Sequence, residues 1–347
     1  KMRKILSISV ASYNVENTLK ETVDSMLKCE NVKELEIIIV NDGSKDKTLK
    51  IAENYKKEHP GSIVVVDKKN GGHGSTINAA LDVATGKYFK TVDGDDWVDS
   101  TELDKLIVSL RTCEADLVTS DFSLCLENSG EKVLRHNGID YAGKTINIDD
   151  ILNKRAFQMH EISIRTDLLK DSNCRILENC FYVDREYMQY CVGLSETVCE
   201  YDYNVYQYRV GDINQSVSPQ SRVKRINDQK KLLIRLLEWE EKCPIKSHKQ
   251  YLQKDTLQFI DYIIESYSFF DLQRCSQVKY ELVQLFANIQ KNYSYVDLNK
   301  KYISFWNYNN ASIKSKIFYT IRYLVICSNF KGFSLVMLMQ KIRRKDW

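Results

Sequence analysis

Three things are scarce in this sequence: net charge, cysteines at metal-binding spacing, and long apolar runs. The 347 residues carry a formal net charge of only +3 at pH 7, which is too small to argue for a nucleic-acid partner. The ten cysteines include no CxxC pair, and the spacing of Cys174, Cys180, Cys191 and Cys199 fits no common zinc pattern. We therefore expect reduced core thiols in a cytoplasmic protein.

No apolar run reaches the roughly 20 residues that a membrane-spanning helix needs. Residues 5–10 are too short for the core of a signal peptide. Residues 317–338 are the most apolar stretch, but Arg322 and Lys331 interrupt it. Because residues 311–347 contain eight Lys or Arg and a single Asp, we expect an amphipathic element at the inner membrane surface. The alternative is a core helix with a solvated basic face.

The first hundred residues alternate strand-like and helix-like segments. Short apolar runs rich in β-branched residues are each followed by a polar loop, and the first three are then followed by a helical pattern. This alternation is typical of a mainly parallel sheet with right-handed crossovers, in which the loops after the strands meet at one edge. The predicted strands cover residues 5–10, 36–40, 62–67 and 88–92. The predicted loops cover residues 12–16, 41–44, 70–75 and 93–96.

The loop after the fourth predicted strand is the acidic tetrad at residues 93–96, with the sequence DGDD. Two carboxylates one residue apart at a strand end, here Asp93 and Asp95, can hold a hard divalent cation against a diphosphate. The alternative is a solvated loop that caps the next helix, and Asp99 with Glu102 does predict a helix start. Capping does not explain Asp93 or Asp95, so we predict a metal site.

Taken in order, these motifs resemble those of the family 2 glycosyltransferases, which have the GT-A fold of nucleotide-diphospho-sugar transferases. The motifs are SVASYNVE at 9–16, IIVNDGS at 38–44, NGG at 70–72, Asn78, ATGKY at 84–88 and DGDD at 93–96. The likeness is close over residues 4–100 and looser to about 218. It implies an α/β, Rossmann-like, mainly parallel sheet flanked by helices. It also implies inverting transfer of one sugar, from a UDP-sugar above all, to a hydroxyl of a glycan or lipid-linked acceptor in cell-surface polysaccharide synthesis.

The resemblance also implies a set of donor-binding residues. In this set Asp42 accepts from the uracil N3–H, Glu16 reaches the ribose, and Asp95 and Asp93 ligate Mg²⁺ or Mn²⁺. For Asp42 a plain Asx turn is the alternative. The full implied donor set is Ala11, Ser12, Tyr13, Glu16, Asp42, Asn70, Gly72, His73, Asn78, Asp93, Gly94 and Arg209.

Two positions depart from the family pattern. The family commonly has proline at the position of Ser12, and arginine just before Asn78, where this chain has Ile77. The chain instead offers His73 in a glycine-rich helix start whose N–H groups can hold anionic oxygens. His73 could contact the donor sugar or diphosphate, or be an ordinary surface residue. Arg209 could approach the diphosphate or form a structural salt bridge.

The segment at residues 178–186 resembles the Glu-Asp signature of the family. Its aspartate matches Asp184, whereas the glutamate position holds Val183. The resemblance implies that Asp184 is the general base that deprotonates the acceptor hydroxyl. The alternative is a charge pairing on a helix surface, for example with Arg185.

The periodicity of apolar residues changes to a helical pattern from about residue 222. We predict a GT-A catalytic domain at residues 1–218 and an α-helical domain at 222–347, which could contact a membrane surface or a second copy.

Three other functions are alternatives to single-sugar transfer. A nucleotidyltransferase would have a Gly-rich, basic loop in place of residues 11–16. A non-catalytic sugar-nucleotide or glycan-binding protein would not need all three of Asp93, Asp95 and Asp184. A processive synthase would need membrane spans and a Gln-x-x-Arg-Trp signature, and the sequence shows neither.

Overall fold

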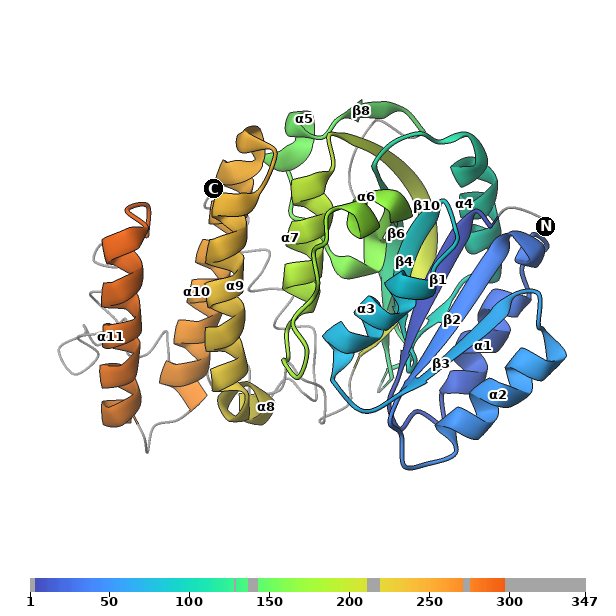
Figure 1. The fold of residues 1–347 in the computed structure, drawn as a ribbon, viewed down its shortest axis with the longest axis horizontal. Coiled ribbons are helices and arrows are strands. Elements are labelled where there is room, and N and C mark those ends of the chain that lie inside the picture. Colours follow the sequence, from blue (N-terminus) through green and yellow to red (C-terminus); the bar gives the residue numbers. More distant parts are fainter. Residues whose placement is uncertain (1–3, 128, 137–142, 211–218, 271–274, 297–347) are drawn as a thin grey trace. The chain divides into compact units, whose positions relative to one another are not determined.

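The computed structural model describes residues 4–127, 129–136, 143–210, 219–270 and 275–296 (Figure 1). The basic element expected at residues 311–347 lies outside these ranges. The contacts divide the chain into two compact units. The first comprises Lys1–Val210 and Ile234–Asp255, and the second comprises Gly211–Leu233 and Thr256–Trp347. The domain division predicted at residues 218–222 stays a prediction.

The first unit is built on a 10-stranded sheet with the strand order β3-β2-β1-β4-β9-β6-β10-β5, in which β7 pairs with β6 and β8 with β10. The N-terminal half is parallel, as predicted. Its strands are β1 (Leu6–Ser12), β2 (Leu35–Asp42), β3 (Ile63–Lys68) and β4 (Tyr88–Asp93). The helices between and after them are α1 (Leu19–Leu27), α2 (Thr48–Glu58), α3 (His73–Val83) and α4 (Ser100–Thr112).

The other half of the sheet mixes directions, which the sequence reasoning did not predict. Strand β9 runs antiparallel to both of its neighbours, β4 and β6, while β10 runs parallel to β6. These strands are β5 (Trp97–Val98), β6 (Leu117–Leu126), β7 (Lys132–Arg135), β8 (Thr145–Asn147), β9 (Ile162–Arg165) and β10 (Thr197–Val210). The helical elements here are α5 (Asp149–Leu152), η2 (Met159–Glu161), α6 (Thr166–Asp171) and α7 (Asp184–Leu194).

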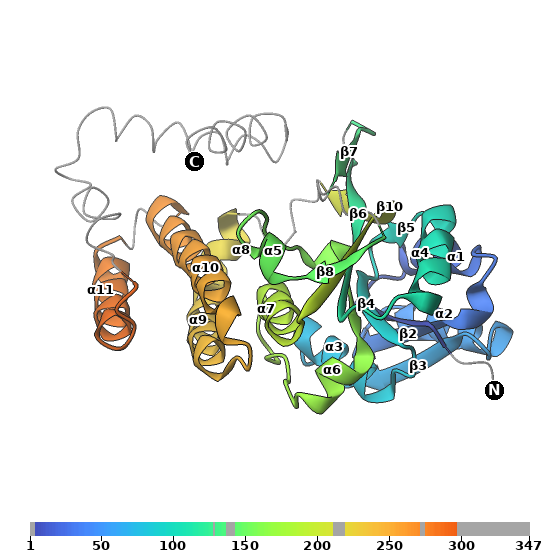
Figure 2. The same ribbon diagram turned by 90° about the horizontal axis from the view of Figure 1, so that it is seen from above.

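Buried side chains explain why the N-terminal strands form. Leu6, Ile8 and Val10 of β1 are fully buried, and so are all four consecutive residues 37–40 of β2. Because successive side chains of a strand point to opposite faces, β2 is covered on both faces of the sheet. Helices α1 and α4 pack against each other, as do α3 and α6 (Figure 2). The strand ends differ slightly from the prediction, because β1 continues to Ser12 and β2 to Asp42.

The strand order reverses between β1 and β4. The chain moves outward from β1 through β2 to β3 and then returns to place β4 on the other side of β1. In open α/β sheets ligands bind outside the carboxyl ends of the strands at such a switch point. Ala11 near the end of β1 pairs with Asp93 at the end of β4, so the fold brings the first and fourth predicted loops together.

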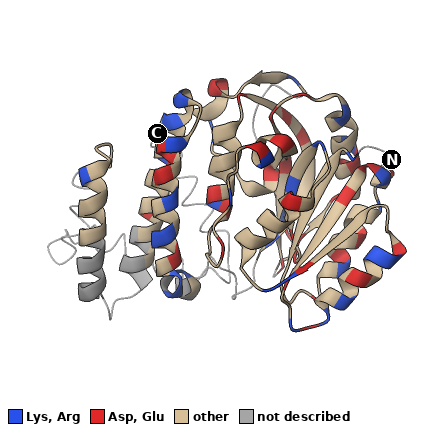
Figure 3. Ribbon diagram, in the orientation of Figure 1, with Lys and Arg blue, Asp and Glu red and all other residues tan. Residues whose placement is uncertain are grey.

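The described part of the second unit is helical, as predicted. It contains α8 (Pro219–Lys224), α11 (Cys275–Asn292) and segments of α9 (Ile226–Lys242) and α10 (Lys249–Phe270). The Arg222 side chain donates to the hydroxyl of Ser266 at 2.9 Å and to the carbonyl of Tyr262 at 2.8 Å. Along the ribbon, basic and acidic residues are interspersed (Figure 3). Within the described ranges no helix combines the length and the apolar character needed to cross a membrane.

Candidate functional site

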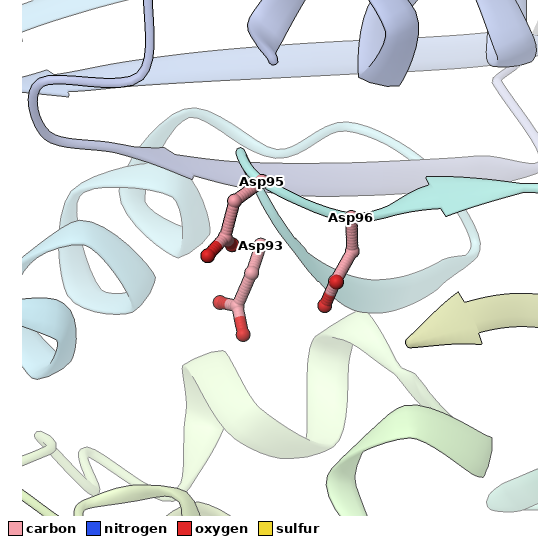
Figure 4. Close-up of side chains that lie close together, drawn as sticks. All are labelled: Asp93, Asp95 and Asp96. Carbon is pink, nitrogen blue, oxygen red and sulfur yellow. The ribbon is translucent and has the colours of Figure 1, made fainter. Parts of the chain in front are cut away.

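The acidic tetrad forms a cluster of three carboxylates at the switch point. Asp93, Asp95 and Asp96 each place one carboxylate oxygen within 4.8 Å of the others, and the three side chains point to the same side of the turn (Figure 4). Asp95 is exposed, Asp93 is half-buried and Asp96 is buried. The structure thus brings together the two carboxylates that the sequence singled out, and adds a third.

Asp96 is held by protein groups on both oxygens. The Tyr206 hydroxyl donates to its Oδ2 at 2.6 Å, and the backbone N–H of Arg209 donates to its Oδ1 at 2.7 Å. Burial, followed by the charges of Asp93 and Asp95, raises the pKa of Asp96 well above its ordinary value. Asp96 therefore ties β10 to the turn, and Asp93 and Asp95 are the carboxylates left to face a ligand.

The turn itself is fixed by hydrogen bonds from α1 and from the residues just before it. The Thr22 hydroxyl donates to the carbonyls of Gly94 at 3.1 Å and Asp96 at 2.6 Å, and the Thr18 hydroxyl donates to Gly94 at 2.9 Å. A Cβ at position 94 would lie 2.7 Å from the carbonyl oxygen of Ala11, so only glycine fits. The structure thus gives a packing reason for a glycine at this position. The predicted role of Gly94 in donor binding stays a prediction.

His73, the first residue of α3, lies against the cluster. Its Nε2 is 3.3 Å from Oδ1 of Asp93. Burial lowers the pKa of His73, but the Asp93 carboxylate, with smaller contributions from Asp184 and Asp95, outweighs burial and raises it. The same pairing outweighs burial at Asp93 and lowers the pKa of that carboxyl. Burial and the charge of Asp93 raise the pKa of Asp95 to about 6.

Asp42 anchors the loop that begins α3. Its carboxylate accepts from the N–H groups of Gly71 at 2.9 Å and Gly72 at 2.8 Å and from the Lys68 ammonium at 2.8 Å. The Asn70 side chain donates to the Asp42 carbonyl at 2.8 Å. Asp42 is only 2% exposed, so these loop bonds, which sequence reasoning missed, occupy most of its carboxylate. Its predicted contact with uracil stays a prediction.

Asn78 lies inside the unit and holds the segment that leads to α7. Its amide nitrogen donates to the Ile176 carbonyl at 2.9 Å and to Glu178 at 3.1 Å, and its amide oxygen accepts from the Ile176 N–H at 2.9 Å. A Cβ at Gly74 would lie 2.0 Å from the Leu177 carbonyl oxygen, so the same segment packs directly on α3. Because Asn78 is 2% exposed and its amide is engaged, this geometry gives it a positioning role, and its predicted donor contact stays a prediction.

Asp184 begins α7, and its side chain is exposed. The preceding loop has positive φ at Asn179 (51°) and Tyr182 (66°), a strained conformation for tyrosine that is commonest at functional sites. Crowding by the surrounding protein raises the pKa of Asp184 although the charge of Arg185 opposes this shift. Arg185 forms an ion pair with Asp255, so the alternative pairing partner of Asp184 is engaged elsewhere.

Sequence reasoning missed His160, which belongs to η2. Its ring stacks on Phe122 (5.1 Å between centroids) and on Tyr208 (4.4 Å), with its edge against Tyr206 at 4.8 Å. Burial lowers the pKa of His160 to about 4, so the imidazole is neutral at pH 7. No motif marks this histidine in the sequence, because only the pairing of β6 and β10 brings its aromatic neighbours together.

Arg209 forms the structural salt bridges that were its alternative assignment. Its guanidinium pairs with Glu21 at 2.7 Å and Glu127 at 3.2 Å, and lies 4.8 Å above the Trp97 ring. Its Nε donates to the carbonyl of Asp95 at 2.8 Å. Arg209 therefore steadies the backbone of the acidic turn, and its predicted contact with the diphosphate stays a prediction.

The predicted base-framing residues lie at and after the end of β1. Tyr13 is 47% exposed and therefore accessible to a ligand. Ser12 is buried, and its hydroxyl donates to the Val10 carbonyl at 3.2 Å. The Glu16 carboxylate accepts from the Lys47 N–H at 2.9 Å. Ala11 lies beside Asp93 in the sheet.

Part of this chain is similar to proteins of a known family. Residues 7–171 match the family model described as Glycosyl transferase family 2. The uncharacterized glycosyltransferase EpsJ of Bacillus subtilis is 38% identical over 121 residues, which cover 35% of each chain. Glycosyltransferase GlyG of Streptococcus pneumoniae is 28% identical over 45% of this chain and 51% of its own. The chain thus spans between about a third and a half of the length of these relatives.

Two solved structures share the fold. S. aureus TarS 1–349 in complex with UDP-GlcNAc aligns with a TM-score of 0.58 at 18% identity, covering 84% of this chain and 91% of that one. The mannosyltransferase PcManGT of Pyrobaculum calidifontis, in complex with GDP-Man and Mn²⁺, aligns with a TM-score of 0.52 at 13% identity, covering 96% and 89%. Together with the matched domain, these likenesses confirm the GT-A fold. Residues 7–171, just under half of the chain, thus form a domain that is similar to those of glycosyl transferase family 2.

Proposed function

We propose that this protein is an inverting, metal-dependent glycosyltransferase that moves one sugar from a UDP-sugar to a hydroxyl of a glycan or lipid-linked acceptor in cell-surface polysaccharide synthesis. The observation that carries the proposal is the placement of Asp93 and Asp95 at the sheet switch point, with His73 against Asp93. The UDP-GlcNAc complex of TarS supports a uridine donor. The name of another relative, the minor teichoic acid biosynthesis protein GgaB, supports a surface polymer.

The donor set fits Mg²⁺ or Mn²⁺. Both are hard cations that prefer carboxylate oxygens, and the exposed Asp95 and half-buried Asp93 offer such oxygens side by side. Both oxygens of the buried Asp96 already accept hydrogen bonds, from Tyr206 and Arg209, so Asp93 and Asp95 are the better placed ligands. When bound, the cation would neutralise charge that develops on the departing diphosphate. The Mn²⁺ in the PcManGT complex supports this assignment.

The donor nucleotide would lie along the ends of β1 and β4. Tyr13 is exposed there and would contact the base. Ala11, Ser12 and Glu16 would complete the surface that binds the nucleoside. The N-terminus of α3, which starts at His73 after Gly72, carries the partial positive charge that favours phosphate oxygens. We therefore place the diphosphate between α3 and the acidic turn.

Asp184 is the proposed general base. Its carboxylate would take the proton from the acceptor hydroxyl while the hydroxyl oxygen forms a bond to C1 of the donor sugar. The bond between C1 and the diphosphate oxygen breaks on the opposite face, so the configuration at C1 inverts. A carboxylate whose pKa is raised, as that of Asp184 is, is a stronger proton acceptor than an ordinary aspartate.

A turnover assay tests the proposal. The full chain with Mn²⁺ is incubated with a panel of nucleotide sugars, first ranked by thermal shift, in the presence and absence of glycan and lipid-linked acceptors. Release of UDP that requires an acceptor supports single-sugar transfer. Release of pyrophosphate from a nucleoside triphosphate and a sugar phosphate would instead identify a nucleotidyltransferase. Binding of a nucleotide sugar without turnover on any acceptor would favour a non-catalytic role.

The membrane-surface and oligomer proposals rest on the sequence alone. Basic side chains near an anionic bilayer contribute about 1 kcal/mol each, and residues 341–345 hold Lys341, Arg343, Arg344 and Lys345. Reversing these four to Glu should weaken co-sedimentation with anionic liposomes while leaving transfer to a soluble acceptor mimic intact. If the unmodified protein does not co-sediment with such liposomes at low salt, the membrane proposal fails.

A further inference from the structure

A cavity of about 640 Å³ lies in the first unit beside the acidic turn, and its volume is in the range of sites that hold small ligands. Its walls come from α1, β5 and the start of α4, with single residues from β7 and β10. We call it the α1–β5 cavity. The residues that matter for its chemistry are Asn17, Lys20, Lys28, Trp97, Lys132 and Gln207. None of them belongs to the donor or catalytic set proposed above.

The charges that line the cavity balance. Three lysines (Lys20, Lys28 and Lys132) face three carboxylates (Glu21, Asp24 and Asp99). Each carboxylate is held in place by the protein: Glu21 by Arg209, Asp24 by the Tyr55 hydroxyl at 2.5 Å, and Asp99 by two N–H groups of α4. A carboxylate accepts more than one hydrogen bond, so these groups still offer acceptors. A ligand of either charge would meet three like charges as well as three opposite ones, so the lining gives no net preference for a charged ligand.

Trp97 gives this polar cavity one aromatic wall. The Lys132 ammonium lies 5.8 Å from the Trp97 ring centre and 3.3 Å from the side-chain oxygen of Gln207. The cavity therefore combines an apolar ring with alternating donors and acceptors and no excess of charge. A neutral carbohydrate has this same combination, because its ring presents C–H faces and its edges present hydroxyls that both donate and accept.

We propose that the α1–β5 cavity binds an uncharged segment of the acceptor glycan, several sugars removed from the hydroxyl that reacts. This inference rests on the glycosyltransferase function proposed above. Arg209 connects the two places, because its guanidinium stacks on Trp97 and its Nε donates to the carbonyl of Asp95. A glycan held against Trp97 thus lies next to the residue that also contacts the acidic turn. Binding remote from the reaction orients the reacting hydroxyl, so short acceptors are poorer substrates.

The test is a glycan array of neutral and acidic oligosaccharides probed with the full chain and with three variants. Trp97→Ala removes the aromatic wall, and Lys28→Trp fills the cavity from an exposed position without touching the core. Lys50→Trp, on the exposed face of α2 and outside the lining, is the matched control. Both cavity variants should lose at least about tenfold in binding of neutral oligosaccharides, as expected for an aromatic anchor. The control should stay within about twofold.

Donor binding separates the two proposals. Binding of UDP in the presence of Mn²⁺ should be the same in Lys28→Trp as in the unmodified chain, because the cavity is apart from the donor residues. If the unmodified chain fails to bind UDP with Mn²⁺, the proposed function fails. The cavity proposal is overturned if the unmodified chain binds UDP but no neutral oligosaccharide. It is also overturned if Lys28→Trp binds neutral oligosaccharides as well as the unmodified chain does. A third contrary result would be that acidic oligosaccharides bind more tightly than neutral ones and that Trp97→Ala weakens this binding.

Discussion

The two halves of the candidate site are built in different ways. One half comes from the ends of β1 to β4, where each loop follows its own strand within the first hundred residues. The other half, with His160, Asp184 and Tyr206, reaches the same place through contacts between residues far apart in sequence. Tyr206 forms a hydrogen bond with Asp96, which lies 110 positions away in the sequence, and Asn78 forms one with Ile176, which lies 98 positions away. The first half thus depends on local strand order and the second on tertiary packing, so substitutions should affect them differently.

The contrast is sharpest between two neighbours, Asp95 and Asp96. They are adjacent in sequence and chemically identical, yet Asp95 is exposed while Asp96 is buried between Tyr206 and the Arg209 backbone. Residue type therefore does not assign the role. The long-range bonds from β10 give Asp96 a structural role and leave Asp95 exposed.

The largest effect is expected for Asp95→Ala. UDP or a UDP-sugar should raise the melting temperature of the unmodified protein only with Mg²⁺ or Mn²⁺, because a diphosphate beside two carboxylates needs a cation between them. Asp95→Ala should abolish this metal-dependent shift and the transfer activity. Glu53→Ala, at an exposed position of α2, is the control. If the unmodified protein bound UDP as strongly without metal as with it, the assignment of Asp95 as a metal ligand would be wrong.

The next effect is expected for Asp184→Asn, which keeps the shape of the side chain and removes the base. Transfer should fall by at least about 10²-fold, the lower value for losing a general base, while UDP binding with metal is unchanged. Since the pKa of Asp184 is raised, the rate of the unmodified enzyme should fall on acidification at a higher pH than an ordinary aspartate would give. If activity stayed within a few-fold of normal, the base would have to be another carboxylate, for which the exposed Glu178 is the next candidate.

A smaller effect is expected for Asn78→Ala, which tests the half of the candidate site that depends on tertiary packing. The change leaves the Ile176 N–H and carbonyl without their buried partner, which costs about 1–3 kcal/mol of unfolding free energy. Transfer should fall through kcat, since the segment before Asp184 loosens, whereas UDP binding should persist. Asp82→Ala on the same helix breaks only an exposed ion pair with Arg175 and should cost at most about 1 kcal/mol.

If Asn78→Ala instead weakened UDP binding as strongly as it weakened transfer, the residue would contact the donor as the sequence first suggested. Urea unfolding curves and steady-state kinetics on the same samples decide between these outcomes.

The sequence predicted the half of the site that strand order determines. Four strands, their parallel pairing and the meeting of Ala11 with the acidic turn follow from apolar runs and loop positions, because a parallel sheet leaves few ways to connect them. The capping of α4 by Asp99 was predicted for the same local reason and is confirmed.

The remaining features depend on partners that a linear reading cannot pair. Asp42 looked like a free acceptor because its contacts come from Lys68 and the glycine loop, about 30 residues away. His160 carried no signal, since a histidine is recognisable as part of a site only once Tyr206 and Phe122 lie around it. The antiparallel insertion of β9 between β4 and β6 likewise follows from tertiary packing.

The smallest expected effect is the pH dependence of metal binding. In the metal-free protein, burial and Asp93 raise the pKa of Asp95 from 3.8 to about 6, so the folded state binds this proton more tightly than the unfolded state does. The proton-linked stabilisation is therefore complete below the unfolded value of 3.8 and is lost as the pH rises through about 6.

A metal must displace that proton, so below pH 6 its apparent affinity should fall about tenfold for each pH unit. The shift in melting temperature produced by Mn²⁺ should accordingly be small at pH 5 and reach its full size above pH 7. Asp95→Asn, which carries no proton to displace, should show a weak shift that is the same at both values. A Mn²⁺ shift in the unmodified protein that is equally large at pH 5 and pH 7.5 would mean that Asp95 does not ligate the metal, whatever its position in the turn.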